Sequence, residues 1–147
     1  MKKVIIFTDG GSRGNPGPSA VGFVFCNEKC QTFKEYSEYL GNGITNNEAE
    51  YRGVVLALKK FKAVFGNKLA KNTEIELRSD SQLMINQLNG EYKVLDEKIQ
   101  LLFLEVWNLK IDFKKMKFKL ISREKNQEAD RLANQALDSQ NKDQKLI

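Results

Sequence analysis

Four acidic residues stand where a strand ends or a helix begins, and together they could bind hard metal ions. Asp9 follows an apolar stretch, and Asp80 follows a stretch in which apolar and charged residues alternate. The carboxyl ends of strands are where α/β proteins usually bind ligands. Glu50 and Asp130 lie near the starts of two stretches with helical periodicity. Taken alone, Asp9 and Asp80 are better explained as turn residues and Asp130 is well explained as a helix-start residue, so it is the set that favours a metal site.

The helix predicted from Thr45 to about Phe65 offers two glutamates, and its periodicity separates them. At about 100° per residue, Glu50 falls on the apolar face and Glu48 on the opposite face. Thr45 and Glu48 match a capping box, which gives Glu48 an ordinary role at the helix start. A glutamate that faces the sheet needs a cation or a proton. Glu50 is therefore the functional candidate.

The remaining composition restricts the chemistry. The sequence contains no histidine, which excludes Ser-His-Asp and Cys-His nucleophile arrangements and the usual histidine-containing zinc sites. The two cysteines, Cys26 and Cys30, cannot complete a zinc shell, so we expect free thiols. Carboxylate oxygens suit Mg²⁺ or Mn²⁺, and Mg²⁺ held by carboxylates and substrate phosphates is the usual arrangement for phosphoryl transfer.

Strands and helices must bring these acids together. Three successive strands with short turns predict an antiparallel meander, and the later helices and strands alternate. This order predicts an α/β fold with one mixed sheet covered by helices. The strands are expected at residues 4–8, 20–25, 32–36, 73–79 and 116–120, and the helices at about 45–65, 81–88, 97–108 and 126–137.

The length of 147 residues fits one domain, which we expect at residues 1–138, followed by a polar tail at 139–147 that frays. The 41% hydrophobic and 29% charged residues are typical of a soluble globular protein. No apolar run is long enough to cross a bilayer, and the apolar run at 4–7 is too short for a signal sequence, so we expect a cytoplasmic protein. The net charge of +5 is compatible with a polyanionic partner.

Four motifs resemble those of the type 1 ribonuclease H family, in the same order and at similar spacing over residues 4–137. They are Phe7 to Gly17, Thr45 to Glu50, Asp80-Ser81-Gln82 and Glu128 to Ala133. Each supplies one of the four acids singled out above. The resemblance implies a ribonuclease H-like fold, whose mixed sheet has three antiparallel strands followed by two parallel ones.

The resemblance also implies an activity. The family enzyme is a metal-dependent endoribonuclease that hydrolyses the RNA strand of an RNA–DNA hybrid and leaves 5′-phosphate and 3′-hydroxyl ends. Two Mg²⁺ ions, replaceable by Mn²⁺, would lie about 3.5–4 Å apart, one activating a water and one stabilising the departing 3′ oxygen. The implied catalytic metal ligands are Asp9, Glu50, Asp80 and Asp130.

Contacts with the hybrid follow from the same resemblance. Recognition in the minor groove can use the RNA 2′-hydroxyls, which distinguish RNA from DNA. The implied groove contacts are the backbone of Gly10 and the side chains of Asn15, Asn46 and Gln82. Thr45 and Asn47 resemble the family's pocket for a phosphate of the DNA strand.

The sequence departs from the family at two loops. Many members carry a histidine before the last helix, whereas residues 122–125 contain none, and Glu124 or Arg123 is a candidate substitute. Some members carry a basic protrusion after the third motif, whereas residues 89–97 contain only Lys93 as a base. We therefore expect a slower reaction and a modest affinity for the hybrid.

Three rival interpretations remain at this point. A catalytically weak or inactive module that binds the hybrid or RNA could share the fold, although the presence of all four acids argues against it. A junction resolvase or transposase-like nuclease is disfavoured by Asn15, Asn46 and Gln82. A nuclease domain fused to a reverse transcriptase is the third, but Met1 standing next to the first strand favours a free-standing protein. We also expect a monomer without an obligate protein partner.

Overall fold

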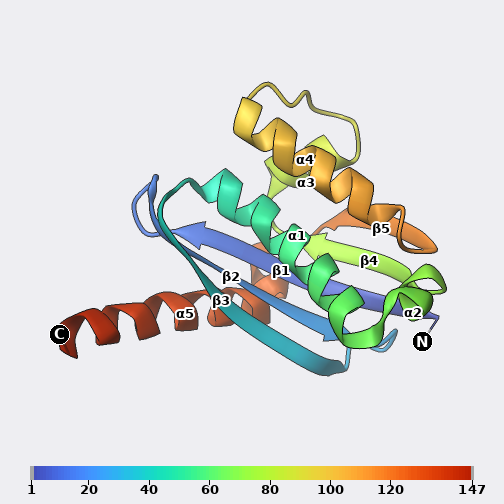
Figure 1. Ribbon diagram of the computed structural model, residues 1–147, viewed down its shortest axis with the longest axis horizontal. Coiled ribbons are helices and arrows are strands. Elements are labelled where there is room, and N and C mark those ends of the chain that lie inside the picture. Colours follow the sequence, from blue (N-terminus) through green and yellow to red (C-terminus); the bar gives the residue numbers. More distant parts are fainter. Residues whose placement is uncertain (1, 147) are drawn as a thin grey trace.

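A single mixed sheet forms the centre of the protein. The computed structural model describes residues 2–146, with side chains for residues 2–140. The strand order is β3-β2-β1-β4-β5 (Figure 1). β1 pairs antiparallel with β2, and β2 with β3, whereas β4 and β5 join in parallel, so the predicted sheet is confirmed. The strands are β1 (Lys3–Ser12), β2 (Gly17–Cys26), β3 (Thr32–Ile44), β4 (Glu74–Ser79) and β5 (Lys115–Leu120).

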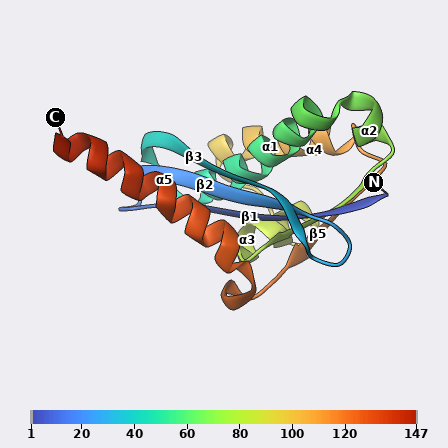
Figure 2. The same cartoon turned by 90° about the horizontal axis from the view of Figure 1, so that it is seen from below.

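Helices cover both faces of this sheet. Helix α1 packs on β1 and β2 and also against α4, whereas α5 packs on β1, β2 and β3 from the other face (Figure 2). None of the helices in the described residues is long and apolar enough to cross a membrane. The helices are α1 (Asn46–Phe65), α2 (Asn67–Lys71), α3 (Gln82–Leu88), α4 (Glu97–Lys110), the 3₁₀ helix η1 (Arg123–Asn126) and α5 (Gln127–Leu146).

The start of α1 confirms Thr45 as the N-cap, but not the predicted bond from the Thr45 backbone amide to Glu48. The Thr45 hydroxyl oxygen accepts a 3.2 Å hydrogen bond from the Glu48 amide and donates one of 3.2 Å to the Glu48 carboxylate. The return bond of the box thus goes to the Thr45 hydroxyl. The helix ends at Gly66, whose φ of 87° is one that glycine adopts without strain.

The core lies mainly between the sheet and α1. Its fully buried members include alternate residues of β1 and β2 and one face of α1. A smaller cluster fills the space between the sheet and α5. The two clusters therefore fix α1 and α5 on opposite faces of β1, which is the arrangement that the candidate site requires. The main cluster contains Val4, Ile6, Phe23, Phe25, Val54, Leu58 and Phe61, and the smaller one Ile5, Val24, Cys26 and Leu132.

Three helices differ from the prediction. The five-residue α2 and the four-residue η1 were not predicted, because each is too short to show helical periodicity. Helix α5 was predicted to end at Leu137 but continues to Leu146, so residues 139–146 are helical and only Ile147 of the predicted tail lies outside the described residues. Apolar periodicity stops where a helix leaves the core, although polar residues such as Gln and Lys still favour a helix. The domain boundary at residue 138 stays a prediction.

Candidate metal centre

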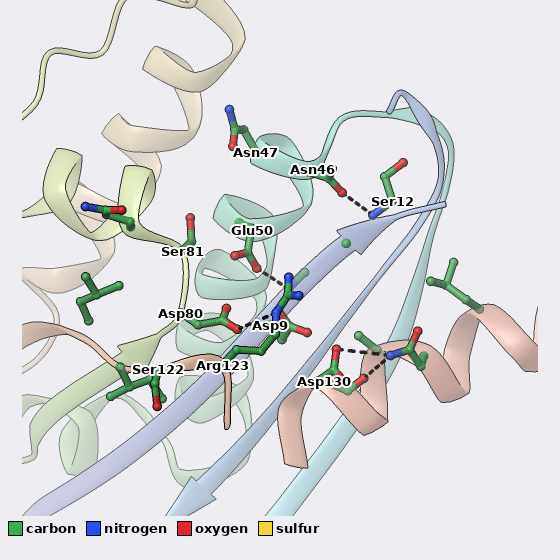
Figure 3. Close-up of a pocket in the computed structure, with 18 of the residues that line it drawn as sticks. Asp9, Ser12, Asn46, Asn47, Glu50, Asp80, Ser81, Ser122, Arg123 and Asp130 are labelled. Carbon is green, nitrogen blue, oxygen red and sulfur yellow. Dashed lines mark hydrogen bonds and ion pairs between the residues drawn. The ribbon is translucent and has the colours of Figure 1, made fainter. Parts of the chain in front are cut away.

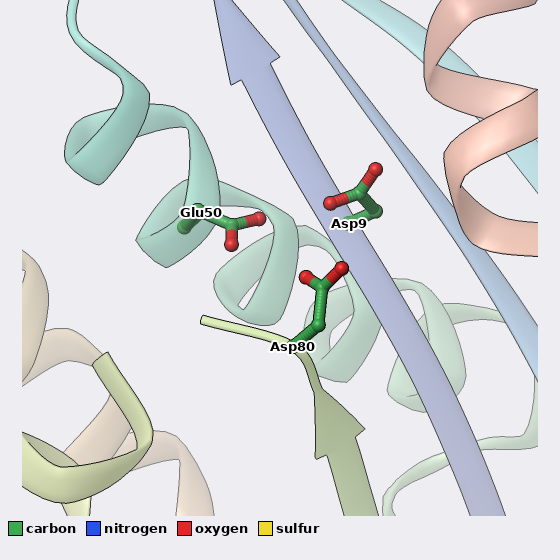
Figure 4. A group of neighbouring side chains, drawn as sticks. All are labelled: Asp9, Glu50 and Asp80. Atoms are coloured by element: carbon green, nitrogen blue, oxygen red, sulfur yellow. The ribbon is translucent and has the colours of Figure 1, made fainter. Parts of the chain in front are cut away.

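Three of the four predicted acids converge on one point. Asp9 lies on β1, Glu50 on α1 and Asp80 directly after β4, and one carboxylate oxygen from each lies within 4.8 Å of the other two (Figure 4). Glu50 is buried, with 9% of its surface exposed, and the two aspartates are half-buried. Glu50 therefore lies in the group and Glu48 does not, which agrees with the direction that periodicity predicted for the two side chains.

A backbone contact holds Glu50 in place. The Gly10 amide donates a 2.5 Å hydrogen bond to Glu50 Oε1. A Cβ atom on Gly10 would lie 2.4 Å from the carbonyl of Ala49, so only glycine lets α1 approach β1 this closely. The predicted role of Gly10 was backbone contact with nucleic acid, and the structure shows its amide serving a metal-ligand candidate.

Two of the three carboxylates, those of Asp9 and Glu50, ionise only with difficulty in the absence of a cation. Burial raises the pKa of Asp9 to about 8, with further contributions from the charge of Asp80 and a hydrogen bond with Asp130. Burial and then the charge of Asp9 raise the pKa of Glu50 well above its usual range. Carboxylate oxygens that are buried and repel one another fit a hard divalent cation. Such a cation would offset both the cost of burying the charges and their mutual repulsion.

Asp130 lies beside this group but outside it. It lines the same hollow and is exposed in the first turn of α5, where its carboxylate accepts a 3.3 Å hydrogen bond from Asn134 (Figure 3). The placement of α5 depends on Gly22 of β2, because a Cβ there would lie 2.2 Å from the Ala129 carbonyl. The structure therefore brings Asp130 to the edge of the predicted site, with its role as a metal ligand still a prediction.

An open hollow of about 600 Å³ lies in front of the acids. Asn46 and Asn47 line it (Figure 3). Gln82 lines it as well, as the predicted contact of these residues with a substrate requires. Asn46 Oδ1 accepts a 2.8 Å hydrogen bond from the Ser12 amide, and Asn15 Oδ1 accepts one of 3.1 Å from the Asn46 amide. Both side-chain oxygens therefore hold the loop between β1 and β2 against α1. Their NH₂ groups donate to no other group among the described residues.

A smaller hollow of about 290 Å³ contains the predicted phosphate pocket. It shares Asn47 with the main hollow and includes Thr45, but two carboxylates, of Glu48 and Asp96, also line it. Asp96 caps α4 by accepting a 3.1 Å hydrogen bond from the Ile99 amide. The chain thus places negative charge where the resemblance implies a phosphate.

The loop before α5 separates its two candidate residues. Arg123 lines the main hollow and its Nε lies 4.0 Å from Asp80 Oδ2, although 93% of its side chain is exposed. Glu124 lines a different hollow, together with Cys26 and Cys30. Both cysteines are free thiols, as predicted. Of the two candidates for the missing histidine, only Arg123 therefore lies beside the acids.

Sequence reasoning missed one residue that positions the site. Asn126 is 1% exposed, and its side-chain amide donates a 2.8 Å hydrogen bond to the Thr8 carbonyl. The sequence signal was only that of a polar residue at a helix start, which gives no sign of burial. Its contact fixes the beginning of α5 to the strand that carries Asp9.

The comparisons with known proteins agree with this geometry. A family model described as reverse transcriptase-like matches residues 7–136. A bifunctional protein of Mycobacterium tuberculosis is 38% identical over 93% of the chain, and ribonuclease HI of Halobacterium salinarum is 38% identical over 92%. The chain spans 36% of the length of the first and 65% of the second.

A solved structure gives the same result. The crystal structure of LC11-RNase H1 in complex with an RNA/DNA hybrid is 42% identical and superimposes with a TM-score of 0.87. The match covers 92% of this chain and 97% of that one, which was isolated from compost by a metagenomic approach. The chain therefore belongs to the reverse transcriptase-like family, and within it to the type 1 ribonucleases H.

Proposed function

We propose that this protein is an endoribonuclease that hydrolyses the RNA strand of RNA–DNA hybrids and leaves 5′-phosphate and 3′-hydroxyl ends. The observation that carries the proposal is the group formed by Asp9, Glu50 and Asp80 at the bottom of an open hollow. The family membership of the protein supports the choice of an RNA–DNA hybrid as substrate, and so does the hybrid bound by LC11-RNase H1.

The acids would hold Mg²⁺, or Mn²⁺ in its place. Two such ions would supply an activated water and stabilise charge on the departing oxygen. The chain's own contribution is to position the ligands: the Gly10 amide orients Glu50, and the packing of α5 brings Asp130 to the edge of the group. The raised pKa of Asp9 leaves its carboxyl poorly suited to ionise until a cation binds.

The polar side chains around the hollow would recognise the hybrid. We assign Asn15, Asn46 and Gln82 to the minor groove, where amide groups can bond to 2′-hydroxyls. Thr45 and Asn47 are assigned to a phosphate of the DNA strand. Asp96 lines the same hollow, and its negative charge would repel that phosphate. A monomeric state and a cytoplasmic location stay predictions from the sequence.

The test is cleavage of a labelled RNA–DNA hybrid in Mg²⁺, beside the same RNA single-stranded and in duplex with RNA. We expect hybrid-specific cleavage that leaves 5′-phosphates and is abolished by a chelator and by Asp80→Asn. Intact hybrid binding without cleavage in Mg²⁺ or Mn²⁺ would contradict the proposal and leave a binding module of the same fold.

A further inference from the structure

Three lysines form a row on the edge strand β5. Strand alternation places Lys115, Lys117 and Lys119 on one face, whereas Met116 and Phe118 on the other face pack against the main core. All three lysines are exposed. Among the residues whose side chains are described, none of the three forms an ion pair with a carboxylate. We call these three residues the β5 lysine row.

The row shares a face of the sheet with two of the metal-ligand candidates, Asp9 and Asp80. Register aligns Phe7 of β1 with Arg78 of β4 and Arg78 with Lys119 of β5. Asp9 and Asp80 come two residues after Phe7 and Arg78, and residues two apart on a strand point to the same face. Asp80 and Asp9 therefore lie two residues further along than Lys119, on the first and second strands beside β5, at the end of the sheet where β4 points (Figure 1).

The part of this sheet face formed by β4 and β5 is open and basic. Helix α5 packs on β1, β2 and β3, and the exposed lysines show that β5 is left accessible (Figure 2). The nearest buried carboxylate, Glu76, is already neutralised by Lys3 at 3.4 Å and Arg78 at 2.6 Å. The charge of the β5 lysine row is thus available to a partner.

We propose that the β5 lysine row binds the phosphate backbone of the hybrid where it extends from the acids past β4 and β5. The inference rests on the proposed function. Alternate residues of a strand are about 6.6 Å apart, so the row covers about 13 Å. At about 3.4 Å per base pair, that length corresponds to about four base pairs of backbone. The loop at 89–97 offers only Lys93, and the row supplies basic charge on another side of the hollow.

The test compares Lys115/117/119→Gln with wild type in hybrid binding. Fluorescence anisotropy in EDTA, over a series of KCl concentrations, measures affinity without cleavage. Each lost phosphate contact lowers the slope of log affinity against log salt by about 0.7–0.9, so the triple variant should lose about 2–3 in slope. Its affinity at low salt should fall at least about tenfold. The single variant Lys119→Gln should lose about 1 in slope.

The matched control carries the same change of charge elsewhere. Lys29, Lys34 and Lys68 are exposed on the β2–β3 turn, β3 and α2. Changing all three to Gln should leave the slope close to that of wild type. Thermal unfolding checks that all variants fold. The same binding measurement is repeated with hybrids lengthened by about ten base pairs, one helical turn, at either end. The extension should increase the affinity difference between wild type and the triple variant at one end of the hybrid and not at the other.

Each result decides the inference separately from the proposed function. A slope for the triple variant equal to that of the control overturns the inference, and leaves the lysines as a guard against edge-to-edge strand pairing. Cleavage by wild type in Mg²⁺ shows at the same time whether the proposed function stands. If wild type does not cleave but the slope difference is found, the basic surface is supported and the activity is not.

Discussion

The side-chain amide of Asn126 donates a 2.8 Å hydrogen bond to the backbone carbonyl of Thr8, the residue before Asp9. The bond is buried and joins residues 118 positions apart in the chain. It ties the start of the helix that carries Asp130 to the strand that carries Asp9. The relative position of these two acids therefore depends on one side chain that contacts neither of them in a described hydrogen bond.

Asn126→Ala should lower both stability and catalysis. Losing a buried hydrogen bond costs about 1–3 kcal/mol, and each kcal/mol lowers Tm by about 2–4 °C in a chain of this size. Because α5 loosens, the Mg²⁺ concentration at half-maximal activity should rise. Asn72→Ala is the control, since Asn72 donates a 3.0 Å bond to the Lys68 carbonyl at the surface. A lower Tm with an unchanged Mg²⁺ midpoint would show that Asn126 has a purely structural role.

The metal-free protein should lose stability as the pH rises from about 4 to about 8. The pKa of Asp9 is raised from 3.8 to about 8, so the folded state favours the protonated acid more than the unfolded chain does. This contribution is fully present below pH 3.8 and is lost as the pH rises through about 8. Tm in EDTA across this range measures it, and Asp9→Asn should flatten the change.

Mg²⁺ should accordingly stabilise the protein more at pH 8 than at pH 5. At the lower pH protons compete for the carboxylates, whereas at the higher pH the cation replaces them. The measurement is the rise in Tm on adding Mg²⁺ at each pH, with Asp9→Asn as the comparison. An equal rise at both pH values in wild type would show that these acids do not bind the ion.

Glu50→Gln and Glu48→Gln form a matched pair on one helix. Glu50 is buried among the acids, whereas Glu48 bonds to Thr45 at the helix start. Loss of a residue that only supports a metal ligand lowers metal affinity or activity about 10–100-fold. Glu50 is itself a ligand candidate, so Glu50→Gln should lower kcat at least about a hundredfold. Glu48→Gln keeps a capping residue and should change kcat less than about threefold. Similar losses in both variants would contradict the assignment.

Arg123→Ala should slow the reaction, whereas Glu124→Ala should not. The Arg123 guanidinium lies 4.0 Å from Asp80 at the mouth of the hollow, and Glu124 lines another hollow. An exposed ion pair contributes little to stability, so Tm should stay within about 1 °C while kcat falls several-fold. Arg123→Lys should restore part of the rate if the positive charge is what matters. A slower Glu124→Ala enzyme would reverse the assignment.

Local patterns predicted the acids because each has a local signature. Helical periodicity separated Glu50 from Glu48, and strand endings marked Asp9 and Asp80. The same short-range patterns predicted one mixed sheet covered by helices, whereas the arrangement of three antiparallel and two parallel strands was implied by the family resemblance. These features depend on neighbours within a turn or a few residues, where spacing decides which way a side chain points.

Contacts between distant segments could not be predicted in this way. The bond from the Gly10 amide to Glu50 and the burial of Asn126 arise only when strands and helices pack. The direction of Arg123 relative to Glu124 depends on the short η1 helix, which has no periodicity to detect. The end of α5 was misplaced for a related reason, because beyond the core its sequence keeps helix-forming residues without an apolar face.

Asp96→Asn should increase the affinity for the hybrid. Asp96 lines the hollow that contains Thr45 and Asn47, the residues assigned to a DNA phosphate. Removing one charge near a phosphate in a solvated hollow should gain about 1 kcal/mol, or about fivefold in Kd. Asparagine is as good a helix cap as aspartate, so α4 should keep its start. Hybrid binding in EDTA measures the change, and thermal unfolding checks the cap.

The matched control is Glu97→Gln, which removes the next charge along the chain, in the first turn of α4 but outside the lining of that hollow. Its effect on Kd should be smaller than that of Asp96→Asn, because of these two residues Asp96 alone lines the hollow assigned to the phosphate. Equal gains from both variants would mean that general charge governs binding, and the phosphate would then have to lie elsewhere. A gain confined to Asp96→Asn, and lost in Thr45→Ala/Asp96→Asn, would place the phosphate in this hollow.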